Sequence, residues 1–442
     1  MNPKSRPHSI VIVGGGAGGL PLATSLGDRY GRKGDVSVTL VDQYPTHLWK
    51  PLLHEVAAGR LNADAHDLDY LAIGYWHHFR FQQGAVARLD RARHELHLAV
   101  VLDDDGGVML PARVIPYDTL IFAVGSASDD FGVPGVAEHA AVLDGLNDAE
   151  RFHRRLLAAC VRADADAAAG NPTGVAIVII GAGATGVELA AEIRQATSDH
   201  AVYGLPNLNA ARDIHITLLE AAPRILPQLS EALATAALKL LARLDVMVRT
   251  DRKVTAVVPG AVETQGGETF RADLIVWAAG IKAPEWLAAL DGLETNRTNQ
   301  LVVLPTVQTS RDPDVFALGD CAACPWTGGA AGSLLPPRAQ VAHQQATFLR
   351  TSMAARIEGR ALPVFRFRDF GSLVSLGELS AVGNLMGGLI GGSLLIQGMI
   401  ARVMYAGLYK LHQISIHGPI RVALDTAGRL LRGGVEPRVK LH

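Results

Sequence analysis

The chain has 442 residues, of which 49% are hydrophobic, and this is enough to build two or three domains with complete cores. Basic and acidic side chains nearly balance, at 41 against 43, so the net charge of −2 gives no overall basic surface for nucleic acid. Three cysteines do not supply a disulfide framework and indicate a reducing compartment. The apolar run near the N-terminus is too short for a secretory signal, so we expect that end to be retained.

A glycine-rich turn joins a buried strand to a helix near the start of the chain. Residues 10–13 are isoleucine and valine, and they lead into the pattern Gly14-x-Gly16-x-x-Gly19. The first glycine permits the tight turn, the second lets backbone amides approach a pyrophosphate, and the third lets helix and strand pack closely. The next strand ends at Asp42, which is placed to accept the hydroxyl hydrogens of an adenosine ribose. An ordinary glycine-rich turn is the alternative, and the acid makes it the weaker one.

The same unit occurs a second time. A strand at residues 175–180 is followed by Gly181-x-Gly183-x-x-Gly186, a helical segment and another strand that ends at Glu220. One chain therefore carries two predicted dinucleotide sites.

The second acid also predicts which nicotinamide nucleotide is used. Its carboxylate would accept a hydrogen bond from a ribose 2′-hydroxyl but repel a 2′-phosphate, so Glu220 favours NADH over NADPH. Arg224 is close in sequence, and its positive charge would weaken this preference. The spacing from Gly186 to Glu220 exceeds the usual value of about 20 residues. We therefore expect an insertion at residues 198–212.

Three further strand ends carry glycine or an acid. Residues 117–123 form a buried strand that is followed by Gly125, and another strand ends at Gly280. A third leads into Gly319 and Asp320, where the carboxylate could bind the ribityl chain of a flavin. Each of these alone is more typical of a plain turn, and their order along the chain makes them informative.

The order of these motifs resembles that of the two-dinucleotide-binding-domain flavoprotein reductases over residues 9–350. Within that superfamily, three segments look like type II NADH:quinone oxidoreductases, which are single-subunit, non-pumping respiratory enzymes: residues 47–57, 183–188 and 336–345. The resemblance implies an α/β fold with two Rossmann-like dinucleotide-binding domains, for FAD and NADH, plus a C-terminal membrane-associating region.

The resemblance also implies a division of the chain. Residues 1–150 would form the first part of the FAD-binding domain and residues 151–285 the NADH-binding domain. Residues 286–350 would complete the FAD-binding domain and carry the quinone-site segment, and residues 351–442 would form the C-terminal membrane-anchoring region.

Site residues follow from the same resemblance, position by position. The FAD contacts would be Gly14, Gly16, Gly19, Asp42, Lys50, Gly125 and Asp320. The NADH contacts would be Gly181, Gly183, Gly186, Glu220 and Gly280. The quinone-site residues would be Gln340, His343 and Gln344, of which the first shares a helical face with the other two.

Two of these segments supply candidate catalytic groups, Glu188 and His343. The family places a carboxylate near the nicotinamide and flavin at the position of Glu188. The alternative role is an acid stabilised by the positive end of its helix, worth about 0.3–1 kcal/mol. Two positions depart from the family pattern: Val124 replaces the commoner threonine, and Glu378 lies near the position where many members have a basic residue.

Cysteines and histidines offer a weaker set of alternatives. Cys321 and Cys324 could form a redox dithiol or half of a metal site, but a second ligand pair is missing. Sixteen histidines show no recurring metal spacing, and we expect no metal.

The C-terminal part is basic and apolar. The stretch of residues 379–401 has no charge, but its six glycines make a spanning helix less favoured than its length suggests. From residue 379 onward, seven basic and two acidic residues give a charge of +5. Apolar residues then recur at helical spacing: Met399, Ile400, Val403, Met404, Leu408 and Leu411. The pattern favours a peripheral, monotopic anchor at the cytoplasmic face of a membrane, with a homodimer interface as the alternative.

The predicted reaction is hydride transfer from NADH to FAD, followed by two-electron reduction of a membrane quinone. No array of charged residues in spanning helices offers a path for proton pumping. One alternative is a sulfide:quinone oxidoreductase, which needs reactive cysteines near the flavin. The other is a flavoprotein redox sensor or interaction protein with slow NADH oxidation.

Overall fold

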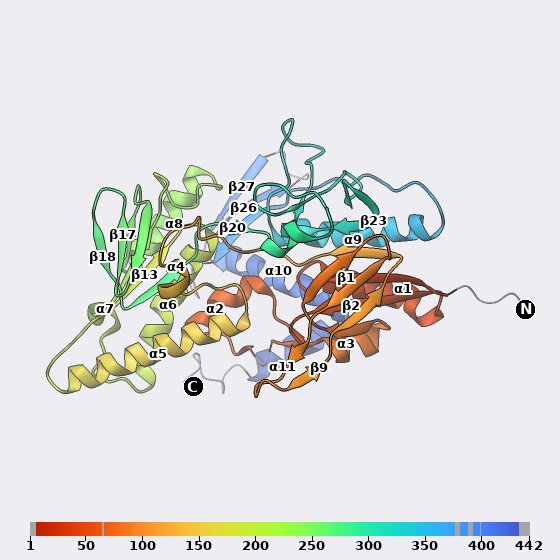
Figure 1. Cartoon of the computed structure of the whole chain (residues 1–442). Helices are drawn as coiled ribbons and strands as arrows, with labels where there is room; N and C mark the ends of the chain where they lie inside the picture. Colours follow the sequence, from red (N-terminus) through yellow and green to blue (C-terminus); the bar gives the residue numbers. More distant parts are fainter. Residues whose placement is uncertain (1–5, 64–65, 376–380, 388–391, 398, 433–442) are drawn as a thin grey trace, which may run out of the picture. The chain divides into compact units, whose positions relative to one another are not determined.

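The computed structural model describes residues 6–63, 66–375, 381–387, 392–397 and 399–432. The chain divides into two compact units, each assembled from three stretches (Figure 1). The first contains residues 1–49, 67–127 and 282–368, and the second contains residues 50–66, 128–281 and 369–442. The division into FAD-binding, NADH-binding and anchoring segments given above stays a prediction, because it concerns which residues bind which ligand.

The first unit is built on a six-stranded sheet. In spatial order its strands are β22 (Gln308–Thr309), β23 (Asp312–Ala317), β11 (Thr119–Phe122), β1 (His8–Val13), β2 (Val36–Asp42) and β5 (Arg80–Gln83). All are parallel except the edge strand β22. Residues 10–12 of β1 are fully buried, as expected for a parallel strand that is covered on both faces.

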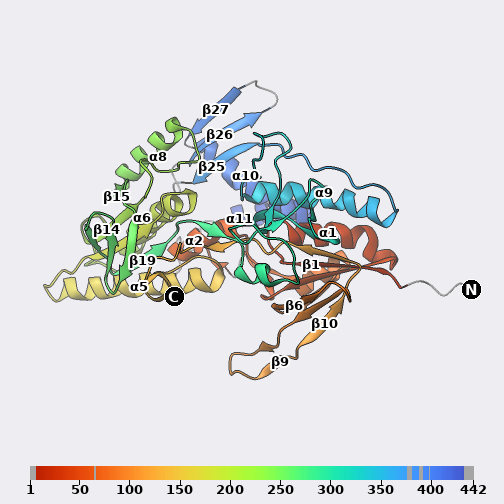
Figure 2. The same ribbon diagram turned by 45° about the horizontal axis from the view of Figure 1, so that its top comes forward.

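Helices cover this sheet. Helix α1 (Gly19–Tyr30) packs on β1 and β2, and α9 (Ala339–Ile357) lies beside α1 (Figure 2). Helix α3 (Tyr70–His77) packs on α1 and β5. A small antiparallel sheet is formed by β10 (Arg113–Pro116), β7 (Glu95–Leu98) and β6 (Val86–Asp90), and a hairpin by β8 (Val101–Leu102) and β9 (Val108–Leu110).

The second unit contains a smaller sheet of the same kind. Its four parallel strands are β15 (Val246–Arg249), β14 (Ile214–Leu219), β13 (Val175–Ile180) and β19 (Leu274–Trp277), in that order. A three-stranded antiparallel sheet accompanies it: β16 (Val254–Val258), β17 (Ala261–Thr264) and β18 (Thr269–Arg271). The helices are α2 (Leu53–Ala58), α4 (Val136–His139), α5 (Leu146–Ala168), α6 (Ala184–Tyr203), α7 (Ala210–Asp213) and α8 (Glu231–Arg243).

Together the two units confirm the expected α/β fold with two Rossmann-like domains. The long spacing after the second glycine turn has a simpler origin than an insertion, since α6 runs for 20 residues and continues to Tyr203 before the short helix α7. The alanine-rich segment around Cys160 is the amphipathic helix α5, which buries Phe152, Leu156 and Cys160 on one face.

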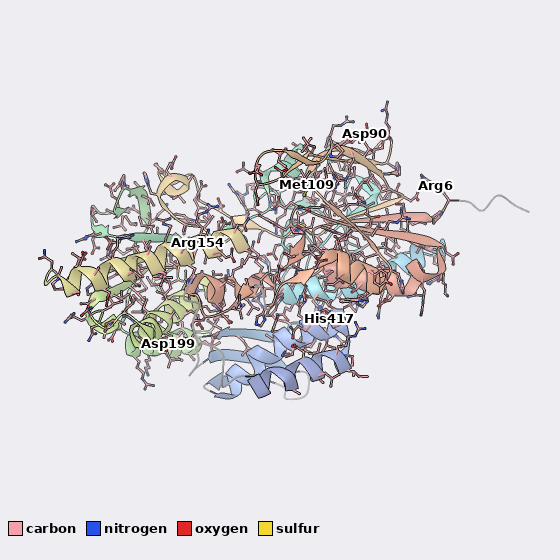
Figure 3. All side chains as sticks on the ribbon, turned by 90° about the horizontal axis from the view of Figure 1, so that it is seen from below. Arg6, Asp90, Met109, Arg154, Asp199 and His417 are labelled. Atoms are coloured by element: carbon pink, nitrogen blue, oxygen red, sulfur yellow. The ribbon has the colours of Figure 1, made fainter. Side chains whose placement is uncertain are left out.

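The described residues of the uncharged C-terminal stretch lie in two strands and at the start of a helix. Strands β25 (Gly371–Ser375), β26 (Ala381–Gly387) and β27 (Gly392–Gln397) make an antiparallel sheet that packs on α10 (Met399–His417). Helix α11 (Pro419–Arg432) lies beside α10, whose end is marked by His417 in Figure 3. Over the part of the chain that the structure describes, no helix combines the length and hydropathy needed to cross a membrane.

Candidate functional site

The first glycine turn shows why its three glycines are needed. Gly14 adopts a φ of +99°, and a Cβ atom there would lie 2.5 Å from the carbonyl oxygen of Ala123. A Cβ on Gly19 would lie 1.8 Å from the carbonyl oxygen of Gly14. At Gly16 the nearest atom is 4.0 Å away, so the backbone there faces open space. Two glycines are required by packing, and the middle one leaves room for a ligand to approach.

The second turn repeats this geometry. Gly181 has a φ of +102°, and its Cβ would lie 2.7 Å from Cα of Ala279. A Cβ on Gly186 would lie 1.9 Å from the carbonyl oxygen of Gly181, whereas nothing lies within 4 Å of one on Gly183. Both turns end at the N-terminus of a helix whose amide groups suit a pyrophosphate. The two sites therefore fit dinucleotides.

The two acids also occupy equivalent positions. Oδ2 of Asp42 accepts from the amide of Gly15 at 2.6 Å, and Oε2 of Glu220 accepts from the amide of Ala182 at 2.8 Å. Burial raises the pKa of Asp42, and backbone hydrogen bonds oppose this shift. Each acid thus ties its strand end to the residue after the first glycine, where a ribose beside the pyrophosphate would lie.

Arg224, which could have accommodated a 2′-phosphate, is held by its own loop. Its guanidinium donates to the carbonyl oxygens of Leu226 at 3.2 Å and Pro227 at 2.7 Å. In the structure, the guanidinium of Arg224 is thus engaged by its own loop.

Asp320 lies in a group of hydrogen-bonded polar residues in the first unit. Oδ2 of Asp320 accepts from the hydroxyl of Ser126 at 2.9 Å, and its carbonyl accepts from the side chain of Gln300. The side chain of Gln345, fully buried on α9, accepts from the amide of Gly319 at 2.7 Å. Sequence reasoning missed these three polar partners. Ser126 lies two residues after Val124, so a hydroxyl is present near the position where the family pattern has threonine.

Lys50 is the exception among the predicted FAD contacts. It is exposed, it begins a 3-10 turn, and it belongs to the second unit, whereas the other predicted FAD residues belong to the first.

Glu188 on α6 is a buried carboxyl group. Its Oε1 accepts from the backbone amide of Ser375 in β25 at 2.9 Å, and its Oε2 lies 3.7 Å from Nδ1 of His54 on α2. Burial raises the pKa of Glu188 to about 8, which the Ser375 amide opposes and the negative charges of Glu55 and Glu192 reinforce. The carboxyl is therefore largely protonated at neutral pH.

His54 is a functional candidate that the sequence alone did not single out. Its side chain is 3% exposed, and burial lowers its pKa to about 4. Among the described residues no group makes a hydrogen bond with its Nε2. A neutral imidazole with an available nitrogen thus lies beside a protonated carboxyl. His54 lies in the segment of residues 47–57 that resembles the family, but nothing in the spacing of that segment showed that this histidine would contact α6.

The neighbouring acid on the same helix behaves differently. Glu192 forms a buried ion pair with Arg60 at 3.0 Å, and Arg60 also pairs with Asp199, which is labelled in Figure 3. The arginine compensates the charge of Glu192, whereas Glu188 has an amide and a neutral ring as its partners. Of these two acids, Glu188 is the one suited to hold and release a proton.

The predicted quinone-site residues share helix α9. Gln340, His343 and Gln344 are all half-buried. The side-chain amide of Gln344 donates to the carbonyl of Arg368 and accepts from its amide, at 2.8 and 3.0 Å. Burial lowers the pKa of His343. His343 and Glu188 belong to different units, and residues 376–378, which bear on the polar lining of this site, lie outside the described residues.

The cysteines do not have the character of reactive thiols. All three are buried and free. Burial raises the pKa of Cys321 to about 12 and that of Cys324 to about 11. Because the thiolate is the nucleophile and the metal ligand, these protonated thiols are poorly suited to either role at neutral pH.

Three potential metal ligands meet on the β6–β7 hairpin: Asp90, Glu95 and His97. The guanidinium of Arg88 contacts two of them, at 3.4 Å from Asp90 and 3.1 Å from His97. A fixed positive charge in this position makes the group an ion-pair cluster.

Comparison with known proteins identifies a family and two relatives with similar names. The family model of the pyridine nucleotide-disulphide oxidoreductases matches residues 8–346. The chain is 41% identical to a type II NADH:quinone oxidoreductase of Haemophilus influenzae, over 98% of this chain and 100% of the relative. It is 29% identical to the type II NADH:quinone oxidoreductase NdhA of Mycobacterium tuberculosis, covering 85% of this chain and 78% of that protein.

Two solved structures share the fold. NDH2 of Plasmodium falciparum, in complex with NADH, matches with a TM-score of 0.80 at 16% identity, over 98% of this chain and 100% of that one. The sulfide:quinone oxidoreductase of Aquifex aeolicus matches with a TM-score of 0.70 at 17% identity, over 97% and 96% of the two chains.

Proposed function

The chain belongs to the type II NADH:quinone oxidoreductases, and from this membership we propose how its own residues carry out the reaction. It is an FAD-dependent NADH:quinone oxidoreductase. FAD, when bound, accepts a hydride from NADH and passes two electrons to a quinone, so the protein supplies binding, orientation and protons.

The first unit binds FAD and the second binds NADH in this proposal. The FAD adenosine half contacts the turn from Gly14 to Gly19 and the carboxylate of Asp42, with Asp320 at the ribityl chain. Support comes from the Ser126–Asp320–Gln300 hydrogen bonds, which hold a polar group at a strand end of the same sheet. Gly125 lies at a φ of +72° with open space beside it, as a cofactor-facing backbone requires. Lys50 remains a proposed FAD contact.

NADH binds to the second glycine turn, with Glu220 at the adenosine ribose. Support comes from the geometry shared by the two turns, down to the acid that accepts from the amide after the first glycine. Gly280, at a φ of +68°, lies three residues after the end of the neighbouring strand β19.

Glu188 is the proposed proton donor for quinone reduction. Reducing a quinone by two electrons consumes two protons, and a donor works best when its pKa is close to the operating pH. The observation that carries this proposal is the buried, raised-pKa carboxyl of Glu188 next to the neutral ring of His54. The available Nε2 of His54 gives a second position through which a proton could reach the carboxyl. His343, with Gln340 and Gln344 on α9, is proposed to act at the quinone itself.

The C-terminal helices are proposed to bind the cytoplasmic face of a membrane peripherally. Leu411 on α10 and Ile420 and Leu424 on α11 are 61%, 76% and 69% exposed, and basic Arg421 lies among them on an exposed position. Apolar side chains beside positive charge suit anionic lipid. Two of the basic residues counted in the sequence, Arg438 and Lys440, lie outside the described residues. A homodimer that covers the same apolar side chains is the alternative.

Sulfide:quinone oxidoreduction is the second candidate, on the strength of the shared fold. It requires reactive cysteines, and the raised pKa values of the three buried thiols argue against it.

The test is the reductive half-reaction under anaerobic conditions. NADH should bleach the flavin of the purified protein within the turnover time, and sulfide at the same concentration should not. Bleaching by sulfide alone would support the second candidate, and slow bleaching by either would support a redox sensor.

A further inference from the structure

Phe131 is an exposed aromatic residue on a constrained backbone. Its side chain is 65% exposed, and its φ of +52° lies in the left-handed region that bulky residues avoid. The turn is held by side chains of the preceding residues, since the amide of Phe131 donates to Asp129 and that of Gly132 donates to Asp130, at 3.0 and 3.1 Å. An exposed, unfavourable conformation that is fixed in this way points to a functional constraint.

The turn is tied to the carboxyl end of β19. The indole N–H of Trp277 donates to the carbonyl oxygens of both Asp129 and Ala279 at 2.8 Å. The amide of Asp129 also donates to the carbonyl of Gly280. Trp277 is itself part of the buried core of the second unit, together with Val136, which follows the turn. Phe131 therefore exposes its side chain from a turn whose backbone is anchored on both sides.

The ring of Phe131 lies directly against Gly280. A Cβ atom on Gly280 would lie 2.2 Å from the tip of the ring, Cζ. The glycine is thus needed to seat the ring as well as to adopt its φ of +68°. Since the side chain is still mostly exposed, it is accessible to a ligand at this strand end.

The strand order indicates which part of a dinucleotide would reach this ring. The sheet runs β15-β14-β13-β19, with Glu220 after β14 and the glycine turn after β13. An adenosine ribose at Glu220 and a pyrophosphate at the turn leave the far half of the dinucleotide to extend over the end of β19. That half is the nicotinamide riboside, and Phe131 stands at this end.

We propose that Phe131 is a binding contact for the nicotinamide riboside half of NADH, with its ring positioned by Gly280 and Trp277. This inference rests on the proposed NADH site in the second unit. A flat apolar ring can cover the nicotinamide or the carbon face of its ribose, and its fixed backbone means that little ordering accompanies binding.

The test compares NADH with ADP, which lacks the nicotinamide riboside. In Phe131→Ala, KM for NADH should rise about three- to tenfold while kcat changes by less than twofold, and the inhibition constant of ADP should stay at the wild-type value. Phe131→Leu, which keeps an apolar side chain without the flat ring and adds no atom at the ring tip, should give a KM between those of the wild type and Phe131→Ala. Val161→Ala, which shortens another exposed apolar side chain of the second unit, should change neither constant.

The outcomes separate this inference from the proposed function. An unchanged KM for NADH in Phe131→Ala, with a wild-type flavin that NADH bleaches, overturns the role of Phe131 alone. Equal weakening of NADH and ADP would also overturn it, because the substitution would then have disturbed the whole site. A wild-type flavin that NADH does not bleach would instead refute the proposed function, whatever Phe131 does.

Discussion

Nδ1 of His54 lies 3.7 Å from Oε2 of Glu188, and both side chains are buried. His54 comes from the helix at residues 53–58 and Glu188 from the helix that follows the second glycine turn. Burial shifts the two pKa values in opposite directions, to about 4 and about 8, so both groups are mainly neutral at pH 7. This pair gives the first two predictions.

Quinone reduction should depend on protonated Glu188. Because its pKa is raised to about 8, the donor form is present below that pH and is lost as the pH rises through it, so the rate of flavin reoxidation by quinone should fall above pH 8. Glu188→Gln should lower this rate by about 100-fold, and the rate of the variant should no longer fall above pH 8. Flavin reduction by NADH should change by only a few fold. Stopped-flow measurements from pH 6 to about pH 9.5 would decide, and the same fall in rate at alkaline pH in the variant would exclude Glu188 as the donor.

His54 should make the protein less stable in acid. Its pKa falls from 6.5 to about 4 on folding, so the unfolded chain binds a proton that the folded chain does not, and stability decreases as the pH drops from 6.5 to 4. The free energy of unfolding should fall by about 2–4 kcal/mol over this range for this group. His47 and His343 also have lowered pKa values and stay in place, so His54→Gln should remove only part of the acid-induced loss of stability. Urea unfolding at pH 4.5 and 7 measures this, and parallel curves for both proteins would contradict it.

The nicotinamide preference should depend on Glu220. The enzyme should use NADH with a kcat/KM about 10- to 100-fold above that for NADPH, because the 2′-phosphate would meet a carboxylate. Glu220→Gln should raise kcat/KM for NADPH and so bring the two kcat/KM values closer together. Arg224→Gln serves as the control and should leave the ratio unchanged, since that guanidinium donates to its own loop. A wild-type enzyme that uses both nucleotides equally would remove Glu220 from this role.

Substitutions at two nearby glycines should affect stability and nucleotide binding separately. A Cβ on Gly183 meets nothing within 4 Å, whereas one on Gly186 would lie 1.9 Å from a carbonyl oxygen. Gly183→Ala should therefore keep the wild-type Tm and FAD content while raising KM for NADH. Gly186→Ala should lower stability by about 1–3 kcal/mol. Thermal unfolding and NADH titration of both variants test this, and a stable Gly186→Ala protein with unchanged NADH affinity would show that the turn is wider than described.

Lipid binding should depend on exposed side chains of α11. Ile420→Ser combined with Leu424→Ser should reduce binding to vesicles that contain anionic phospholipid and slow the reduction of long-tailed quinone. NADH oxidation with a soluble dye should stay near the wild-type rate. Because electrostatic attraction contributes, higher salt should weaken vesicle binding of the wild type. If the double variant changes the oligomeric state and leaves vesicle binding intact, this surface is a subunit interface.

Much of the nucleotide-binding fold could be predicted because residues close together in the sequence determine it. The strand at residues 175–180 was predicted at its observed limits, since an unbroken run of six apolar residues that leads into a glycine turn leaves little alternative. The glycine patterns likewise fix their own geometry, as the blocked Cβ positions at Gly19 and Gly186 show.

The remaining features depend on contacts distant in sequence. His54 meets Glu188, and Ser375 reaches the same carboxyl, across separations that no spacing rule covers. The uncharged stretch from residue 379 was weighed as a spanning helix because of its length and lack of charge, yet it contains β26, which pairs with β25, and β27, which pairs with β26. Pairing between strands, and not composition, decided that structure.

One chain should transfer two electrons from NADH to quinone, and sequential anaerobic mixing measures both half-reactions. The enzyme is first mixed with one equivalent of NADH and then with a quinone, while flavin absorbance and quinol are recorded. We expect loss of flavin absorbance, its full recovery on addition of quinone, and one quinol formed for each NADH consumed. A flavin that NADH bleaches but quinone does not restore would contradict this expectation.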